Sequence, residues 1–281
     1  MIRTWFTGAS GMRAQQWRLD AASNNLANVD VDGYKKDVAA FKAFPELLMR
    51  RMDDDGVYRH PFGSADLAPV IGKLGTGVEF NELYTDFQQG EFKETGSDFD
   101  LALDGKGFFT VQTPWGERYT RNGAFHLGKE GFLETKEGYP VLGENGPLRV
   151  KANNFQVDKA GRVWINAEYA DDELVDRERN TWGDTVMLDT LKVVDFDLDR
   201  YIEKQGSNLY RATEISGEAR LMDIEDRPRV VQGFTEGSNV DPVLEMVHMI
   251  EVNRAYEANQ KVIQSGDAML GTLINQTSRL G

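Results

Sequence analysis

The sequence predicts a mixed α and β fold, in which N- and C-terminal helices pair as a coiled coil and a central antiparallel β domain is rich in hairpins. Apolar residues recur at helical spacing near both ends of the chain, and these two patterns predict the helices. A third supports the β domain, because short apolar runs alternate with closely spaced turn signals through the middle. With 281 residues, the chain is long enough to bury a sizeable core.

The first predicted element is a helix near the N-terminus. Its glycines, Gly8 and Gly11, each cost about 1 kcal/mol relative to alanine, so the helix should be marginal by itself. An ordinary surface helix on a domain core remains an alternative interpretation. The residues that follow one another at steps of four and three are Trp5, Ala9, Met12, Gln16, Leu19, Ser23 and Leu26.

The stretch NVDVDGYKK, residues 28–36, follows this helix and matches the first half of an EF-hand calcium loop. Position twelve of such a loop requires a bidentate glutamate, and here it is Ala39, while Lys35 places a positive charge beside the ion. We therefore expect no calcium. Instead, the Asn and Asp side chains favour the end of the helix, and Gly33 permits a positive φ at a hinge.

The middle of the chain is predicted to be antiparallel β structure. Residues 98–104, DFDLALD, alternate apolar and polar side chains like a strand with one face in water. Residues 71–77, IGKLGTG, are interpreted as a turn, and residues 45–75 as a loop or extended arm. Residues 166–184 are interpreted as an exposed polar insertion between strands.

The last predicted element is a long helix that begins at Asp241-Pro242, a capping residue followed by proline, and extends to about Asn275. Its apolar residues form two adjoining stripes, and a single partner helix covers only one. The helix is therefore either sunk in a large core or buried between neighbouring molecules.

Composition limits the possible functions. A net charge of -14 argues against binding nucleic acid or an anionic membrane. The absence of cysteine excludes disulfides and thiolate sites. We expect no catalytic residues, no cofactor and no metal. A secreted enzyme acting on cell-wall glycans remains open, because a pair of carboxylates could come from Glu91, Glu94, Asp98, Asp100 and Asp104. The N-terminal residues lack a Sec-type signal and no segment has the length of a membrane span, so physics alone predicts a soluble, cytoplasmic protein.

Three motifs resemble the axial rod and hook proteins of the bacterial flagellum. Residues 19–36, LDAASNNLANVDVDGYKK, look like the N-terminal signature of that family. FDLALDGKGFFTV, YTRNGAF and GFLETKEGYPVLG, between residues 99 and 143, resemble its central β-domain motif. Residues 236–274 resemble its C-terminal signature.

The resemblance implies a domain organisation. Residues 1–34 and 240–281 would form a helical inner (tube-core) domain, residues 35–90 and 228–239 an extended linking region, and residues 91–227 an outer β domain. It also implies certain residues. Those expected in the assembly seam are Leu19, Leu26, Met246, Ile250, Tyr256, Ile263 and Leu270, and those matching the family signatures are Asn24, Asn25, Asn28, Gly33, Asn239 and Arg254.

The resemblance further implies a structural subunit without catalysis, with copies of itself, neighbouring rod proteins and the flagellar export apparatus as partners. It would be exported without a cleaved signal and would lie in the periplasmic rod of the basal body, with no membrane insertion. AFKAFP, VLGENGPLRV and TEGSNVD favour the proximal rod subunit (FlgF type), with the distal rod subunit (FlgG type) as the alternative. Outside the family, a glycan-acting enzyme and an adhesin with coiled-coil ends remain alternatives.

Overall fold

The computed structural model describes residues 2–50, 58–60, 63–65, 70–151, 154–166, 185–206, 208–223 and 226–277. The predicted polar insertion at 166–184 lies outside these residues apart from its first position. The chain divides into two compact units, each described here by itself. The first comprises Met1–Asn24, Val38–Leu83 and Val243–Gly281, and the second Asn25–Asp37 and Tyr84–Pro242.

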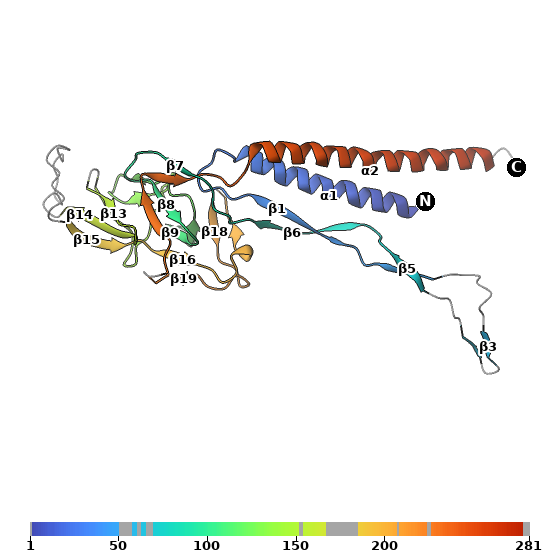
Figure 1. Cartoon of the computed structure of the whole chain (residues 1–281), viewed down its shortest axis with the longest axis horizontal. Coiled ribbons are helices and arrows are strands. Elements are labelled where there is room, and N and C mark those ends of the chain that lie inside the picture. Colours follow the sequence, from blue (N-terminus) through green and yellow to red (C-terminus); the bar gives the residue numbers. More distant parts are fainter. Residues whose placement is uncertain are drawn as a thin grey trace. The chain divides into compact units, whose positions relative to one another are not determined.

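Two long helices dominate the first unit. Helix α1 spans Ile2–Ala27 and helix α2 spans Pro242–Thr277, so both predicted terminal helices are confirmed (Figure 1). The predicted starting signal is accurate for α2, because the helix begins at the proline that follows Asp241. It continues through Gly266 to two residues beyond the expected end.

Glycines bring the two helices close together. A Cβ atom added at Gly8 would lie 3.0 Å from Cγ1 of Ile263, and one added at Gly11 would lie 2.9 Å from Nδ2 of Asn259. On α2, a Cβ at Gly266 would lie 2.7 Å from Nε1 of Trp5. The glycines that weaken α1 as an isolated helix are therefore the residues that let it approach α2.

An antiparallel ribbon packs on α1. Strand β1 (Asp37–Ala43) pairs with β6 (Val78–Thr85), and β2 (Leu47–Arg50) pairs with β5 (Val70–Leu74). A short hairpin is formed by β3 (Tyr58–His60) and β4 (Gly63–Ala65). The ring of Trp17 stacks on that of Phe80 at 4.7 Å between centroids, which joins α1 to the ribbon.

This ribbon corrects one expectation. Residues 71–74, interpreted as part of a turn, lie in β5, and both ends of the stretch 45–75, interpreted as a loop or extended arm, contain paired strands. The sequence argument gave weight to glycine and charge. However, cross-strand hydrogen bonds between Leu47–Arg50 and Val70–Leu74 hold the backbone extended.

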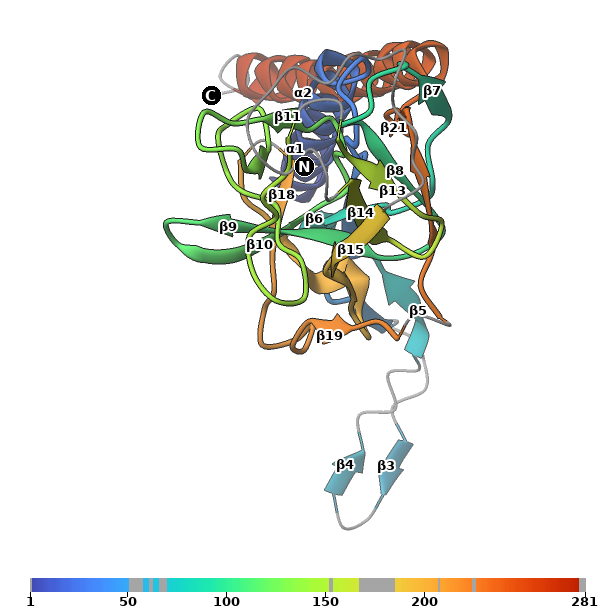
Figure 2. The ribbon, with the colours of Figure 1, turned by 90° about the vertical axis from the view of Figure 1, so that its left-hand side faces the viewer.

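The second unit is a β domain in which the strand pairs of the described residues are all antiparallel, as predicted (Figure 2). Its largest sheet has the order β17-β18-β10-β9-β16-β19, with the β9–β10 hairpin turning at Pro114-Trp115. The strands are β7 (Phe92–Glu94), β8 (Leu101–Asp104), β9 (Phe108–Thr113), β10 (Gly116–Thr120), β11 (His126–Leu127), β12 (Leu133–Glu134), β13 (Gln156–Val157), β14 (Arg162–Asn166), β15 (Thr185–Thr190), β16 (Val193–Asp195), β17 (Glu203–Lys204), β18 (Leu209–Arg211), β19 (Arg220–Leu221), β20 (Arg229–Gln232) and β21 (Phe234–Glu236), with a 3₁₀ turn at Asp199–Tyr201.

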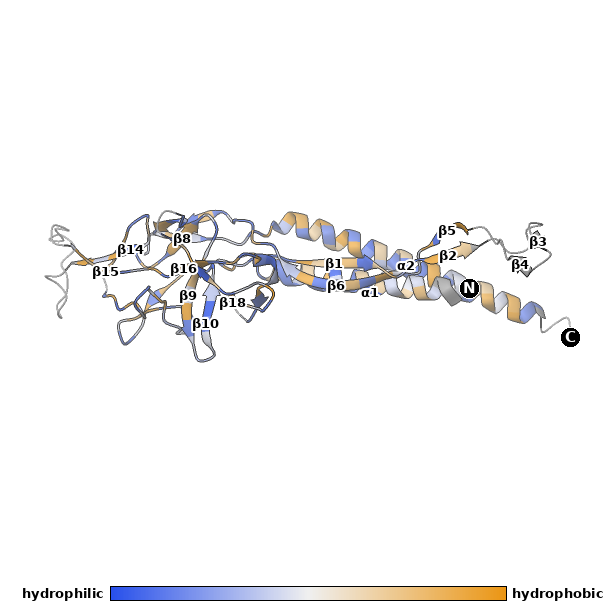
Figure 3. Cartoon of the chain, turned by 90° about the horizontal axis from the view of Figure 1, so that it is seen from below, coloured by the Kyte–Doolittle hydropathy of each residue, from blue (hydrophilic) through white to orange (hydrophobic). Residues whose placement is uncertain are grey.

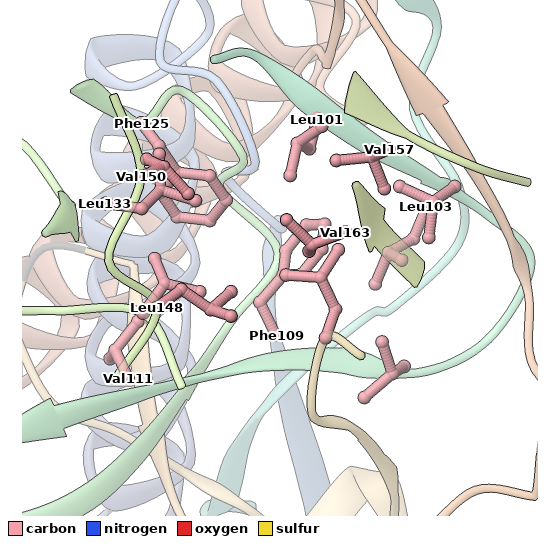
Figure 4. Close-up of a cluster of buried hydrophobic side chains, with 14 of the residues drawn as sticks. Leu101, Leu103, Phe109, Val111, Phe125, Leu133, Leu148, Val150, Val157 and Val163 are labelled. Atoms are coloured by element: carbon pink, nitrogen blue, oxygen red, sulfur yellow. The ribbon is translucent and has the colours of Figure 1, made fainter. Parts of the chain in front are cut away.

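The core of this unit is drawn from many strands. Leu101, Phe109, Leu133 and Val163 converge in it, and each is fully buried (Figure 4). Strand β8 differs from the expected strand with one wet face, because Ala102 is as fully buried as its neighbours. Antiparallel pairing with β20 places β8 inside the domain, where the small alanine side chain can be enclosed on the second face.

We predict that Gly8→Leu destabilises the helix pair, because overpacking at such a contact typically costs about 1–3 kcal/mol. The matched control is Gly271→Leu, at an α2 position with nothing within 4 Å of the added Cβ. There the substitution should increase helix stability by about 0.8 kcal/mol. Urea unfolding followed by circular dichroism at 222 nm measures both, and a Gly8→Leu protein as stable as the parent would contradict the close approach.

Candidate functional site

One face of α2 is half-buried within its unit. Three of its residues, Asn259, Ile263 and Gly266, are those that approach α1. The half-buried positions follow one another at steps of three and four, which is the spacing of a helix–helix contact. They are Glu245, Met249, Val252, Ala255, Asn259, Ile263, Gly266 and Leu270.

The seven predicted seam residues do not share one environment. Ile263 and Leu270 lie on the half-buried face of α2, and Leu19 and Leu26 are half-buried on α1. The other three are exposed on α2, with 51% of Met246, 53% of Ile250 and 40% of Tyr256 accessible. The predicted seam therefore combines an internal helix contact with positions on an open surface.

Large apolar side chains are exposed along the whole of α2, which alternates orange and blue in Figure 3. Soluble monomers rarely expose apolar patches this extended, so such a surface usually marks a contact with another molecule. We call these residues the open apolar face: Val243, Leu244, Met246, Val247, Ile250, Tyr256, Val262, Met269, Leu273 and Ile274.

The segment that follows α1 adopts the predicted turn. The helix ends at Ala27, and Gly33 has a φ of 69°, in the left-handed region that favours glycine. A Cβ atom there would lie 2.4 Å from the backbone nitrogen of Asn122, so a side chain is also excluded by space. Gly33 donates its N–H to the carbonyl oxygen of Glu236 at 2.6 Å.

Two of the signature asparagines hold the backbone together within the second unit. Buried Asn25 bonds both backbone groups of Asp37, donating at 3.0 Å and accepting at 2.9 Å, and it also accepts from the hydroxyl of Tyr34. Asn239 accepts from the N–H of Lys36 at 2.8 Å and donates to the carbonyl oxygen of Asp86 at 2.8 Å.

The remaining signature residues have other surroundings. Asn24 and Arg254 are exposed, and Asn28 is half-buried. The structure therefore brings Asn25, Gly33 and Asn239 into the second unit, where each lies beside the segment 28–36 or its continuation, and it does not bring the exposed pair there.

A buried charged cluster lies beside Gly33. Lys35 and Glu236 are ion-paired with both side chains fully inaccessible, and Arg121, 4% exposed, lies 3.5 Å from the second carboxylate oxygen of Glu236. Lys35 also donates to the carbonyl oxygen of Gln88 at 2.7 Å, and Gly90 donates its N–H to Glu236 at 2.9 Å. We call Lys35, Arg121 and Glu236 the charged cluster.

The electrostatics of the charged cluster follow from burial. Desolvation lowers the pKa of Lys35, and the nearby carboxylate of Glu236 acts in the opposite direction. Burial likewise lowers the pKa of Arg121, again opposed by Glu236. One carboxylate thus compensates two cations that water does not reach, and its removal would leave both uncompensated.

Sequence reasoning missed this cluster. It used Lys35 only as an argument against calcium, and it gave Arg121 and Glu236 no role. Each residue lies in one of the three motifs, but no local signal shows that they meet, because they are separated by 86 and 115 positions in the chain. Among the described residues, no group of three or more His, Asp and Glu side chains is placed to hold a metal ion.

Neither described helix combines the length and apolar character needed to cross a membrane. Of the carboxylates considered for glycan chemistry, Asp100 is half-buried, and Glu91, Glu94, Asp98 and Asp104 are exposed.

We predict that Glu236→Gln destabilises the second unit by about 3–5 kcal/mol, because it leaves Lys35 and Arg121 as buried cations without a counter-charge. Glu117→Gln is the matched control, since it removes the same charge from a partly exposed pair with Lys192 and should cost at most about 1 kcal/mol. Urea unfolding of the two variants measures the difference, and equal stabilities would show that the cluster is not required.

Comparison with known proteins shows the family of the chain. Three family models match: "Flagella basal body rod protein" over residues 7–35, "Flagellar hook protein FlgE/F/G D1 domain" over 102–165, and "Flagellar basal body rod FlgEFG protein C-terminal" over 231–276. Each matched range contributes one residue of the charged cluster.

Relatives match over nearly the full length of the chain. The flagellar basal-body rod protein FlgG of Buchnera aphidicola subsp. Schizaphis graminum is 33% identical, with 97% of this chain and 99% of the relative covered. FlgG of Borreliella burgdorferi is 33% identical, with 98% of each covered, and FlgG of Bacillus subtilis is 32% identical, with 98% and 99% covered. These proteins are structural and not enzymes, and the chain belongs to their family, the flagellar basal-body rod proteins.

Proposed function

We propose that this chain is a distal-type subunit of the flagellar rod, which polymerises through its terminal helices to form part of the drive shaft for motility. The observation that carries the proposal is the full-length similarity to proteins named FlgG. The sequence analysis favoured the proximal type on short motifs. The comparisons support its alternative better, because they extend over the whole chain and not over a few short segments.

The terminal helices would act as a coiled coil within each subunit. The half-buried face of α2 has the appropriate spacing, and the contacts of Ile263 with Gly8 and of Gly266 with Trp5 support it. The open apolar face would then be covered by the helices of neighbouring copies and other rod proteins. This accounts for the apolar residues of α2 that a single partner helix leaves in water.

The predicted domains take on roles in this proposal. Residues 1–34 and 240–281 would form the inner wall of the rod, residues 91–227 its outer layer, and residues 35–90 and 228–239 the link. The subunit would reach the periplasmic rod through the flagellar export apparatus, without a cleaved signal. Family membership supports this location.

We predict that the labelled chain is found in the distal part of the rod. The measurement is electron microscopy of isolated basal bodies that carry an epitope tag in the chain, detected with gold-labelled antibody. Label confined to the proximal part would favour the FlgF-type alternative, and basal bodies without label would contradict the proposed function.

We predict that Ile250→Asp abolishes incorporation into the rod while the subunit remains folded. Ile250 is 53% exposed, so a carboxylate there is hydrated in the monomer but would have to be buried between copies. It is a sharper test than Ile263→Asp, which would also disrupt the contact with α1.

Asn253→Asp, an exposed polar position on the same helix, is the matched control and should leave incorporation intact. Circular dichroism of the purified subunits confirms folding, and immunoblots of isolated basal bodies measure incorporation. Normal incorporation of the Ile250→Asp subunit would contradict burial of the open apolar face.

A further inference from the structure

A pocket of about 310 Å³ lies within the second unit, and its size is at the lower end of the range for small-molecule sites. Its lining residues come from the segment 84–88, the start of β9, strand β16 and the 3₁₀ turn, together with Arg121 of the charged cluster. The rings of Phe87 and Phe108 belong to its wall. Because Lys106, another lining residue, is exposed, the pocket connects the buried charges with the surface of the unit.

Arg121 contributes a buried guanidinium with unused donors. Its side chain is 4% exposed, and its Cζ atom lies 5.3 Å from the centre of the Phe108 ring. Among the described residues, neither Nε nor Nη1 has a hydrogen-bond partner, since the 3.5 Å between Nη1 and Glu236 joins an ion pair without a hydrogen bond. Buried polar groups are nearly always hydrogen-bonded, so these two donors indicate an acceptor that enters through the pocket.

The charge of the cluster favours an anion as that acceptor. Lys35 and Arg121 carry two positive charges and Glu236 a single negative one, so one buried positive charge is in excess. Burial lowers the pKa of Arg121, and the lining residues Asp195 and Asp199 raise it less than the carboxylate of the cluster does. Neither of them accepts a hydrogen bond from Nε or Nη1. An anion in the pocket would supply both the acceptor and the missing charge.

The other charged groups of the pocket favour a monoanion. Asp86 is paired with Lys36 at 3.3 Å, and the guanidinium of Arg200 lies over the ring of Tyr84 at 4.2 Å. Lys106 adds a positive charge at the exposed rim. A dianion such as hydrogen phosphate would be repelled by the carboxylates of the pocket about twice as strongly as a monoanion, because the energy scales with the product of the charges.

We propose that this pocket binds a small carboxylate, whose oxygens accept hydrogen bonds from Arg121 and whose short aliphatic stem packs against Phe87 and Phe108. A carboxylate suits a guanidinium in charge and in geometry, and the aromatic wall favours carbon atoms beside the charge. Such a group can belong to a free organic acid or to an acidic side chain of another protein. The site goes beyond the proposed function, because it does not depend on how subunits assemble.

An NMR titration of the purified full chain tests the site. The reporter is the Nε–H signal of Arg121, assigned by its absence from the spectrum of Arg121→Lys or by its nuclear Overhauser contacts with the ring of Phe108. Sodium butyrate replaces sodium chloride at constant ionic strength, which keeps general screening unchanged. We expect a saturating shift of this signal, with half-saturation at millimolar butyrate.

A second titration distinguishes the two sources of the carboxylate. N-acetylglutamic acid α-amide, which carries the side chain of glutamate without the charges of a free amino acid, replaces butyrate under the same conditions. Tighter binding of this probe assigns the pocket to an acidic side chain of a protein, and tighter binding of butyrate assigns it to a free acid. Either result supports the site.

Two charge variants at the pocket give opposite predictions. Lys106→Glu should weaken the binding of butyrate several-fold, and Asp199→Asn should strengthen it several-fold, because each changes the charge beside an anion. The matched controls are Lys136→Glu and Asp197→Asn, at exposed positions that do not line the pocket, and they should leave binding unchanged. Circular dichroism confirms the folding of each variant.

The absence of a saturating shift with both probes in the parent chain would overturn the carboxylate site. A shift that Lys106→Glu strengthens and Asp199→Asn weakens would also overturn it, because those signs belong to a cation. If the pocket variants and their controls change the shift equally, the carboxylate binds elsewhere on the molecule, and the proposal is wrong.

Discussion

The second unit depends on the ion pairs that the carboxylate of Glu236 forms with two buried cations. This carboxylate compensates Lys35 and Arg121 in a place that water does not reach, and it accepts the backbone N–H of Gly90. Lys35 extends the same connection to the carbonyl oxygen of Gln88. The cluster thereby joins the segment after α1, the segment after β6 and the strand before α2. In sequence, these three segments lie beside the positions where the chain passes from one unit to the other.

The two units use apolar residues in different ways. The second unit buries residues such as Phe109 and Leu133 in its own closed core. The first keeps α1 and α2 together through close contacts at glycines, while large side chains such as Val243 and Met269 stay exposed. A unit organised in this way keeps apolar surface exposed, and contacts with other molecules can bury that surface. In a rod protein, that division separates folding of the subunit from growth of the assembly.

Sequence reasoning predicted what local signals encode. Asp241-Pro242 marked the start of α2, the turn residues predicted antiparallel hairpins, and Gly33 was expected at a positive φ. It failed where the deciding partner is distant. Gly8 looked like a weakness because Ile263, which explains it, lies 255 positions further along the chain. The residues of the charged cluster lie in three separate motifs, and no local pattern showed that they meet.

The assembly seam stays a prediction, because helical spacing shows that an apolar stripe exists but not which stripe faces α1. Ile263 and Leu270 lie toward the internal contact, whereas Met246 and Ile250 lie on the open side. Subtype was harder still. Short motifs such as TEGSNVD pointed to the proximal rod, and only similarity over the full length favoured the distal alternative.

The exposed apolar side chains along α2 have a consequence for how long a rod can grow. Every copy that docks uses one surface of its neighbour and brings a fresh one of its own, so the growing end is chemically the same after each addition. Such a contact does not depend on how many copies have already been added, so it does not limit the length of the assembly. The length of the shaft would then be determined outside this interface, by the supply of subunits or by whatever covers the last exposed helix.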